Sequence, residues 1–176
     1  LNGASNNMVK NAVLLGVSTS SANGIVFFGT TTSTGNNNNT INNCLITKGA
    51  SFNYYGVYIN GSANPNDNVG NTISGCDIVD FSNTAVYIAA NARNTTISQN
   101  NIYSSTLPRT TSTTLQGVDM HSTSVGGTVI ERNKIYNLHT TGTTPTIRAI
   151  YLYNGSSSLV NTVRNNFIAL ENDTTH

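Results

Sequence analysis

The sequence is poor in charge: Asp, Glu, Lys and Arg make up only 9% of its 176 residues, and the net charge is +1. A chain without a basic stripe cannot release counterions from a phosphate backbone, so we exclude an electrostatic nucleic-acid binder. Long apolar runs are also missing, and none approaches the ~20 residues that a membrane-spanning helix needs. The first residues lack the layout of a secretory signal peptide, so we expect a mature product or a segment of a longer protein.

Potential metal ligands are scarce as well. The three histidines, His121, His139 and His176, are isolated from one another, and the two cysteines have no histidine near them. This pattern does not match the spacing of zinc ligands. We therefore expect no metal ion and no cofactor.

Neutral polar residues take the place of charge, since Asn, Thr and Ser fill 73 positions, 29 of them Asn. Such a composition can indicate disorder. The apolar residues, however, alternate with polar ones inside short repeated phrases, which is typical of half-buried strands. No long stripe has the period of a helix, and β-branched residues are frequent. We therefore predict an all-β protein.

One phrase of about seven residues returns six times, at intervals of 24 to 33 residues. Its copies are Val9–Leu14, Thr40–Ile46, Thr72–Ile78, Thr96–Ile102, Val129–Ile135 and Thr162–Ile168. A fixed pattern at this period indicates a stacked repeat, in which each unit buries its apolar face against its neighbours.

A second phrase lies between the copies of the first and begins with a small residue. Two positions per copy are expected to point inward: Ile25 and Phe27, Val57 and Ile59, Val86 and Ile88, Val118 and Met120, and Ile150 and Leu152. The residues between them are expected to point outward: Val26, Tyr58, Tyr87, Asp119 and Tyr151.

Together the phrases give about three short strands per unit. We therefore predict that residues 1–176 form one parallel β-helix of about five to six coils. Nothing in the sequence resembles an amphipathic capping helix. We expect the solenoid to continue, or adjoining domains of the same chain to cover its ends.

The bend inside the seven-residue phrase carries polar residues that we expect to stack. Asn100, Asn133 and Asn166 are predicted to form an internal hydrogen-bonded ladder, on a bend whose αL backbone asparagine tolerates. Cys44 and Cys76 hold the same place in earlier copies. They are either buried free thiols that fill space or the two halves of a disulfide between adjacent strands. The run 36–39 (NNNN) is interpreted as a loop tip.

The phrases N-T-I-x-x-N-x-I and G-V-Y-I resemble the repeats of right-handed parallel β-helix proteins, the pectin-lyase-like superfamily. The similarity covers roughly residues 7–170. In that family each coil runs through strand PB1, turn T1, strand PB2, a tight Asn-bearing turn T2, strand PB3 and turn T3. Here G-V-Y-I resembles PB1, and the seven-residue phrase resembles PB2–T2–PB3. The resemblance implies a right-handed coil but leaves activity open, because the superfamily hosts lyases, hydrolases, adhesins and inert spacers.

The Asn-rich and Thr-rich style also resembles large surface proteins that bacteria export by type IX secretion. That resemblance implies a secreted or cell-surface location.

The family places its active cleft on the outer face of PB1, so this face is the candidate site. It would carry Val26 and Phe28 and then a row rich in tyrosine: Tyr58, Asn60, Tyr87, Ala89, Asp119, His121, Tyr151 and Tyr153. Exposed tyrosines stack on sugar rings and add hydrogen bonds. A polysaccharide or another surface glycan is therefore expected to bind Tyr58, Tyr87, Asp119, His121, Tyr151 and Tyr153. The alternative is structural, because Tyr favours strands and stacks on itself along a solenoid.

Asp119 and His121 are the only acid–imidazole pair expected on that face, and Arg109, His139 and Arg148 could reach it. A lyase needs a base, and a hydrolase needs paired carboxylates, whereas this face offers one. We therefore expect a non-catalytic module, either a rigid scaffold or an adhesin that binds carbohydrate on the PB1 face. The alternative is a polysaccharide lyase or glycoside hydrolase that uses Asp119, His121 and Arg148.

Overall fold

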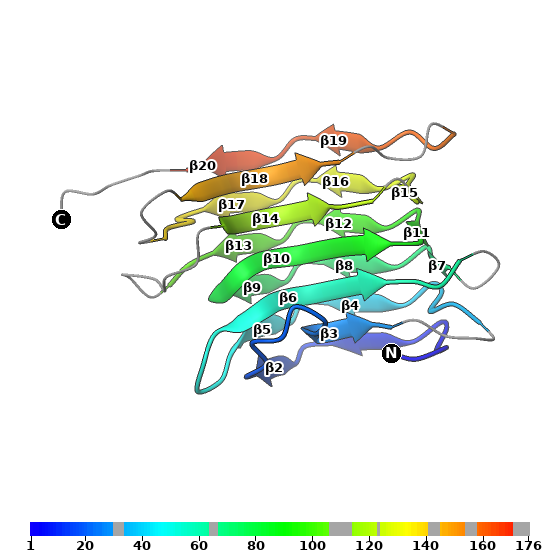
Figure 1. The fold of residues 1–176 in the computed structure, drawn as a ribbon, viewed down its shortest axis with the longest axis horizontal. Helices are drawn as coiled ribbons and strands as arrows, with labels where there is room; N and C mark the ends of the chain where they lie inside the picture. The colour runs from blue at the N-terminus through cyan, green and yellow to red at the C-terminus, as the bar shows by residue number, and fades with distance from the viewer. Residues whose placement is uncertain are drawn as a thin grey trace.

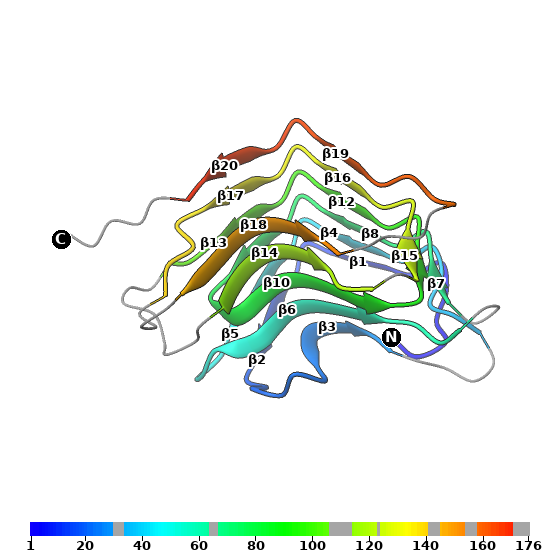
Figure 2. The same cartoon turned by 45° about the horizontal axis from the view of Figure 1, so that its top comes forward.

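The chain folds as an all-β solenoid, seen in the computed structural model in Figures 1 and 2. The structure describes residues 1–29, 34–63, 67–105, 114–122, 124–140, 145–153 and 158–170. Within these ranges the chain contains strands and turns but no helix. Every strand pairs in parallel with its counterpart in the next coil, and the coil winds in a right-handed sense. The predicted fold class is confirmed.

The strand that resembles PB1 builds a five-stranded sheet, which we call the PB1 sheet. Its strands, in spatial order, are β3 (Gly24–Phe28), β6 (Asn53–Asn60), β10 (Phe81–Ala90), β14 (Thr114–Met120) and β18 (Thr146–Leu152). These strands are the longest in the structure because PB1 carries no tight bend.

The seven-residue phrase supplies two further sheets, joined at the T2 bend. The PB2 sheet contains β1 (Met8–Lys10), β4 (Thr40–Asn42), β8 (Thr72–Ser74), β12 (Thr96–Ser98), β16 (Val129–Glu131) and β19 (Thr162–Arg164). The PB3 sheet contains β2 (Val13–Gly16), β5 (Leu45–Lys48), β9 (Asp77–Val79), β13 (Asn101–Tyr103), β17 (Lys134–Tyr136) and β20 (Phe167–Ala169).

A small three-stranded sheet between PB1 and PB2 was not expected from the sequence. It is formed by β7 (Asn68–Val69), β11 (Ala92–Arg93) and β15 (Val125–Gly126). Strands of two residues are too short to show an alternation of apolar and polar positions, so no periodic signal marks them.

The core is a column of stacked aliphatic side chains. Ile41, Ile73, Ile97 and Ile130 pair in register from coil to coil, and all four are buried. The PB3 sheet adds a second column of buried isoleucines at the equivalent positions of its strands. Each coil alone would leave one side of these residues in water, so the stacking of coils is what removes their apolar area from solvent.

The first PB1 coil is shifted by one residue from the expected register. Val26 pairs with Val57 and Phe28 pairs with Ile59, so Val26 and Phe28 point inward and are buried. The expectation that they lie on the outer face is wrong, and Phe27 takes the outward position instead. In this register Gly24 aligns with Tyr55 rather than with Gly56, the glycine of G-V-Y-I, and the large Phe28 side chain is fully buried.

The T2 bend holds an asparagine ladder that runs between coils. The Nδ2 of Asn100 donates to Oδ1 of Asn133 at 3.0 Å, and Nδ2 of Asn133 donates to Oδ1 of Asn166 at 3.0 Å. The backbone N–H of each donor residue bonds to the same Oδ1 of the next coil. These asparagines do not adopt the expected αL backbone. The residue before each of them does, with φ of 58° at Gln99 and 55° at Arg132.

A second ladder stands where a loop tip was expected. Asn39 is buried, and its Nδ2 donates to Oδ1 of Asn71 at 3.1 Å, while Nδ2 of Asn7 donates to Oδ1 of Asn39 at 3.0 Å. Asn36 is also buried and donates from Nδ2 to Oδ1 of Asn68 at 3.0 Å. The interpretation of residues 36–39 as a loop tip is therefore wrong, because the first and last members of the run are buried and bonded between coils.

The two cysteines are free thiols in adjacent coils, and both are buried. The backbone N–H of Cys44 lies 3.5 Å from Sγ of Cys76, so the sulfur takes the acceptor place that an asparagine holds in later coils. Burial raises the pKa of the Cys76 thiol to about 11, which keeps it protonated and unreactive near neutral pH.

The described part of the chain contains no helix that could cross a bilayer.

Candidate functional site

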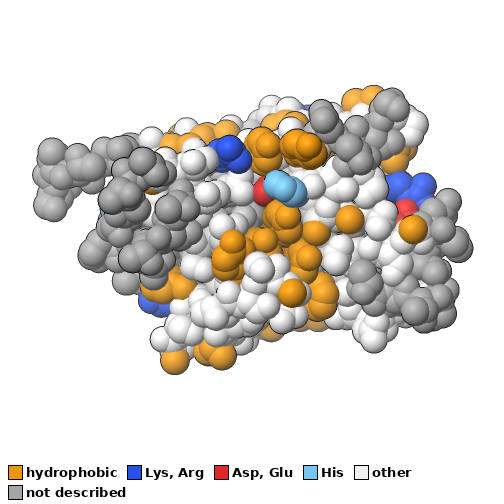
Figure 3. Space-filling model, viewed as in Figure 1, with side chains coloured by type: hydrophobic (Ala, Val, Ile, Leu, Met, Phe, Trp, Pro, Cys, Tyr) orange, Lys and Arg blue, Asp and Glu red, His pale blue; other side chains and the backbone are white. Residues whose placement is uncertain are grey.

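The candidate site is the outer face of the PB1 sheet, which faces the viewer in Figure 3. The register places one outward side chain of each coil in a single column: Phe27, Tyr58, Tyr87, Asp119 and Tyr151. A neighbouring column consists of Tyr55, Thr84, Gln116 and Arg148. In Figure 3 an acidic side chain and a histidine adjoin near the middle of this face, with hydrophobic side chains around them.

The aromatic side chains of this face form one continuous stack. Phe27 and Tyr58 have ring centroids 5.2 Å apart and an interplanar angle of 7°, and Tyr58 and Tyr87 are 5.6 Å apart at 25°. Tyr55 stacks on Tyr87 at 4.5 Å and 8°. Rings in this arrangement cover one another's faces, so they stabilise the sheet and leave mainly their edges to solvent.

The stack is accessible mainly at its C-terminal part. Tyr58 is only 8% exposed, so its ring is not open to a ligand in this conformation. Tyr87 and Tyr151 are partly exposed, and Tyr153 is exposed. His121 joins them, with its ring centroid 5.6 Å from that of Tyr87 and 5.6 Å from that of Tyr153. At this C-terminal part of the stack, the accessible surface consists of the rings of Tyr87, Tyr151 and Tyr153 and the imidazole of His121.

Asp119 lies at the base of this surface and is buried, with 1% of its area exposed. Its Oδ2 accepts a hydrogen bond from Nε2 of Gln116 at 2.8 Å and lies 3.4 Å from Nδ1 of His121. Its Oδ1 has no hydrogen-bond partner in the described part of the chain. A buried carboxylate oxygen without a donor is costly, and a donor from a ligand would relieve that cost.

The electrostatics of the face follow from this burial. Burial raises the pKa of Asp119, while the hydrogen bond from Gln116 and the nearby His121 partly oppose the rise. Burial and the Asp119 carboxylate raise the pKa of Tyr87 to about 12, and burial raises the pKa of Tyr55. The phenols therefore remain protonated and can act as hydrogen-bond donors at neutral pH.

Arg148 is the cation that the structure brings to this site. Its Cζ lies 4.2 Å from the centroid of the Tyr151 ring, and its Nη1 donates to Oε1 of Gln116 at 3.4 Å. The Nδ1 of His139 is buried and has no hydrogen-bond partner within the described ranges. Arg109 lies outside the described residues. Of the predicted site residues, Asp119 and His121 lie side by side, and Arg148 is joined to Asp119 through Gln116.

This arrangement can recognise a polar ligand, but it supplies few groups for chemistry. Asp119 is the only carboxylate on the outer PB1 face within the described ranges, whereas a glycoside hydrolase uses two. No group of three or more potential metal ligands occurs among the residues that the structure describes. The face is thus better suited to binding, through aromatic edges, an imidazole and a guanidinium, than to acid–base chemistry with two partners.

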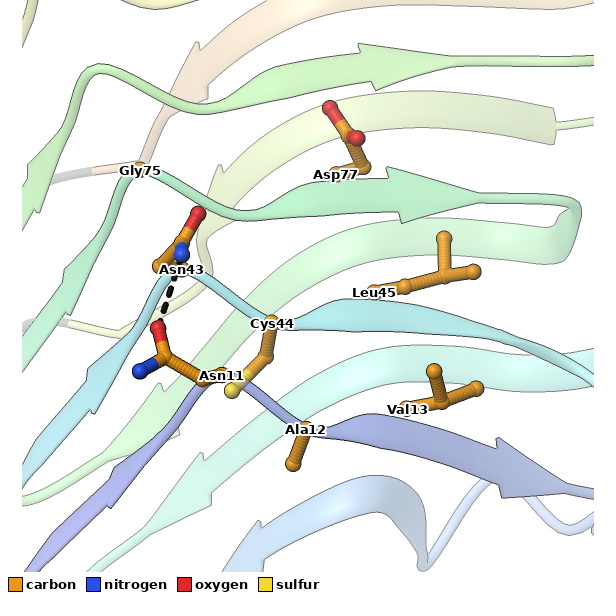
Figure 4. A pocket seen from close by; sticks show the side chains of 8 residues that line it. All are labelled: Asn11, Ala12, Val13, Asn43, Cys44, Leu45, Gly75 and Asp77. Carbon is orange, nitrogen blue, oxygen red and sulfur yellow. Dashed lines mark hydrogen bonds between the residues drawn. The ribbon is translucent and has the colours of Figure 1, made fainter.

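The pocket drawn in Figure 4 lies elsewhere, outside the T2 bend of the first coils. It has a volume of about 280 Å³ and is lined by Asn11, Ala12, Val13, Asn43, Cys44, Leu45, Gly75 and Asp77. Two of these residues are bonded to each other, since Nδ2 of Asn43 donates to Oδ1 of Asn11 at 2.8 Å (Figure 4). It has one carboxylate and no imidazole or guanidinium, so we place the candidate site on the PB1 face instead.

Two residues of the site were missed by sequence reasoning. Gln116 fixes the Asp119 carboxylate, and Tyr55 stacks on Tyr87. Both lie three residues before an outward residue of their own strand, which breaks the alternation with period two. Tyr55 and Gln116 each lie one coil away from Thr84, in the same column of the PB1 sheet. This alignment would have identified them as neighbours of the site, but it can be recognised only when the strand register is known.

Comparisons with protein-family models, with curated proteins and with solved structures gave no match.

The buried carboxyl gives a pH-dependent prediction. Because its pKa is raised, the folded protein binds a proton at Asp119 more tightly than the unfolded chain does. Stability from this group is therefore greatest at low pH and falls as the pH rises through the raised pKa. We expect Asp119→Asn to gain stability relative to the wild type as the pH rises above the ordinary carboxyl pKa of about 4. Urea unfolding over a pH series measures this difference, and parallel pH profiles for the two proteins would contradict it.

Proposed function

We propose that the chain is a non-catalytic β-helical module of a secreted or cell-surface bacterial protein. It serves as a rigid scaffold or adhesin and binds carbohydrate on the outer PB1 face. The observation that carries this proposal is the accessible set of His121, Tyr151 and Tyr153 above the buried, incompletely bonded carboxylate of Asp119. Rings held by a sheet offer apolar area to a sugar ring, and the carboxylate and phenols offer hydrogen bonds to its hydroxyls.

Rigidity supports the scaffold part of the proposal. Two ladders of buried asparagines link successive coils, and each internal member accepts from one neighbour and donates to the next. Such side chains lose their hydrogen bonds if one coil slides or tilts against another. A solenoid held in this way keeps its outer residues at fixed spacings, which suits a surface that must present a binding face.

A polysaccharide lyase or glycoside hydrolase is the alternative, and one contact favours it. Asp119 and His121 lie 3.4 Å apart, and Arg148 is close enough to lower the pKa of the carboxyl. An acid–imidazole pair of this kind can transfer protons. The single carboxylate of the face argues for binding alone.

One panel of soluble polysaccharides can distinguish binding from cleavage. The panel contains neutral glucan, mannan and galactan and acidic polygalacturonate and alginate. Retention in affinity electrophoresis reports binding, and release of reducing or unsaturated ends reports cleavage. We expect retention without cleavage. Tyr153→Ala and His121→Ala should each weaken binding by roughly tenfold, the value of one aromatic contact.

Tyr136→Ala is the matched control, because Tyr136 stacks on Tyr103 at 5.0 Å in the PB3 sheet, away from the candidate face. It should leave retention unchanged. Equal losses in the control and the site variants would contradict the proposed site. Cleavage that disappears in Asp119→Ala would establish the enzyme alternative.

A further inference from the structure

Asp119 carries a buried negative charge that its neighbours compensate only in part. Within the described ranges its carboxylate accepts one hydrogen bond, which comes from the neutral amide of Gln116 at 2.8 Å. Nδ1 of His121 lies 3.4 Å from Oδ2, beyond the usual hydrogen-bond range of about 2.7–3.2 Å. Oδ1 is buried and accepts no bond from the described residues. The carboxylate therefore lacks a donor and a full counter-charge.

Arg148, in the next coil, does not supply this charge directly. Its Nη1 donates to Oε1 of Gln116 at 3.4 Å, and its Cζ lies 4.2 Å from the centroid of the Tyr151 ring. No lysine or arginine of the described chain forms an ion pair with Asp119. Because Arg148 is exposed, water and salt screen its charge, whereas a buried carboxylate is screened much less. The site therefore attracts a cation, although its formal charges cancel.

The surroundings of Asp119 suit an ammonium group. Tyr87 and Tyr151 flank it in the outward column, one coil before and one coil after. The guanidinium of Arg148 over Tyr151 shows that a ring of this face already accepts a cation. An ammonium group brings three donors and a positive charge, which are the two things that the carboxylate lacks. Burial also raises the pKa of Asp119, as expected for a carboxylate whose charge is not fully compensated.

A ligand can reach the carboxylate by moving side chains alone. The side chain of His121 is 52% exposed and lies beside the carboxylate, and Arg148 is exposed as well. In Figure 3 the acidic side chain adjoins the histidine at the surface of this face. Exposed side chains change rotamer within nanoseconds, so a group that brings donors can approach Oδ1 without any change in the sheet.

We propose that the outer PB1 face binds a glycan with unsubstituted amino groups, and that the ammonium group of one amino sugar donates to Oδ1 of Asp119. This inference rests on the proposed carbohydrate binding and adds the class of sugar. The ring of Tyr153 and the imidazole of His121, stacked with centroids 5.6 Å apart, contact the sugar ring beside it. An N-acetylated sugar offers only a neutral amide at the same place, and a uronic acid adds a second negative charge, so both bind more weakly.

Isothermal titration calorimetry with matched oligosaccharides tests the proposal on the unmodified chain. The ligands are short oligomers of β-1,4-linked glucosamine, their N-acetylated counterparts, and oligogalacturonate, at a slightly acidic pH at which the sugar amines are protonated. We expect the amine form to bind roughly ten- to a hundredfold more tightly than the acetylated form, the value of hydrogen bonds to a charged group. Equal affinity for the two forms, or tighter binding of oligogalacturonate, would overturn the inference and leave the proposed function standing. No binding of any sugar would overturn both.

Asp119→Asn is the variant that tests the role of the carboxylate, because it keeps the shape and removes the charge. The preference for the amine form should disappear, while the affinity for the acetylated form should stay the same. Asp77→Asn is the matched control, since Asp77 lies in the PB3 sheet, bonded to Asn101, and it should keep the preference. Equal losses in the two variants would indicate unspecific attraction between charges and contradict the site. A lysine oligopeptide that binds as tightly as the amino sugar would contradict the choice of a glycan.

Discussion

Asn133→Leu is expected to lower the free energy of unfolding by about 2–5 kcal/mol. The substitution keeps the size of the side chain but removes every hydrogen bond that it makes. The buried N–H of Asn100 then loses its acceptor at 3.0 Å, and the carbonyl of Ile97 loses the Nδ2 donor at 2.9 Å. Each buried group left without a partner costs about 1–3 kcal/mol. Equilibrium unfolding in urea measures the loss.

Asn101→Leu is the matched control for this prediction, because it makes the same substitution one position later. The side chain of Asn101 lies on the outer face of β13 and bonds there to Oδ1 of Asp77 at 2.7 Å. Water can replace that bond, so we expect a loss of about 1 kcal/mol or less. Equal effects of the two variants would show that the ladder contributes no more than an ordinary surface amide.

Ile97→Asp is expected to prevent folding at neutral pH. Ile97 is fully buried between Ile73 and Ile130, and the site offers a carboxylate no hydrogen-bond donor from a neighbouring side chain. The lost packing costs about 2–5 kcal/mol, and the buried charge adds several more, which together approach the whole stability of a typical domain.

The pH dependence distinguishes charge from lost packing in this variant. Burial raises the pKa of the introduced carboxyl, so the penalty falls as the pH drops and the group becomes neutral. Ile97→Asp should therefore recover part of its β-structure in acid, as followed by circular dichroism. Ile97→Asn should be equally unstable at all pH values, and Ile97→Val should lose only about 1 kcal/mol. A folded, stable Ile97→Asp at neutral pH would contradict a closed apolar column.

The architecture was predictable because the register is written in the sequence as a repeated pattern. Ile41, Ile73, Ile97 and Ile130 recur with the same polar neighbours, and a parallel stack is the arrangement that buries all of them. Prediction failed where the pattern is weak. In the first PB1 coil the glycine of G-I-V-F suggests one alignment, but packing of Phe28 against the core imposes another, one residue away.

The site was less predictable than the fold, because it depends on contacts between coils. The alternation of apolar and polar positions predicted which tyrosines point outward, but it did not predict that Tyr58 is buried. The rings of Tyr55 and Tyr87 pack against the ring of Tyr58 and cover it, and this packing is visible only in the distances between the rings. The buried ladder residues Asn36 and Asn39 were missed for a similar reason, since a run of four asparagines contains no apolar residue to mark its inward positions.

The central claim is that equivalent residues lie one above another, one coil at a time. Spin labels on the outer face of the PB2 sheet test it most directly, in a protein whose two native cysteines are replaced by alanine. Lys10 and Glu131 are four coils apart in that column, and Lys10 and Arg164 are five coils apart. At ~4.8 Å per coil, the backbone separations should be about 19 and 24 Å, in a straight series. Separations that do not increase by one strand spacing per coil would contradict the stacked solenoid.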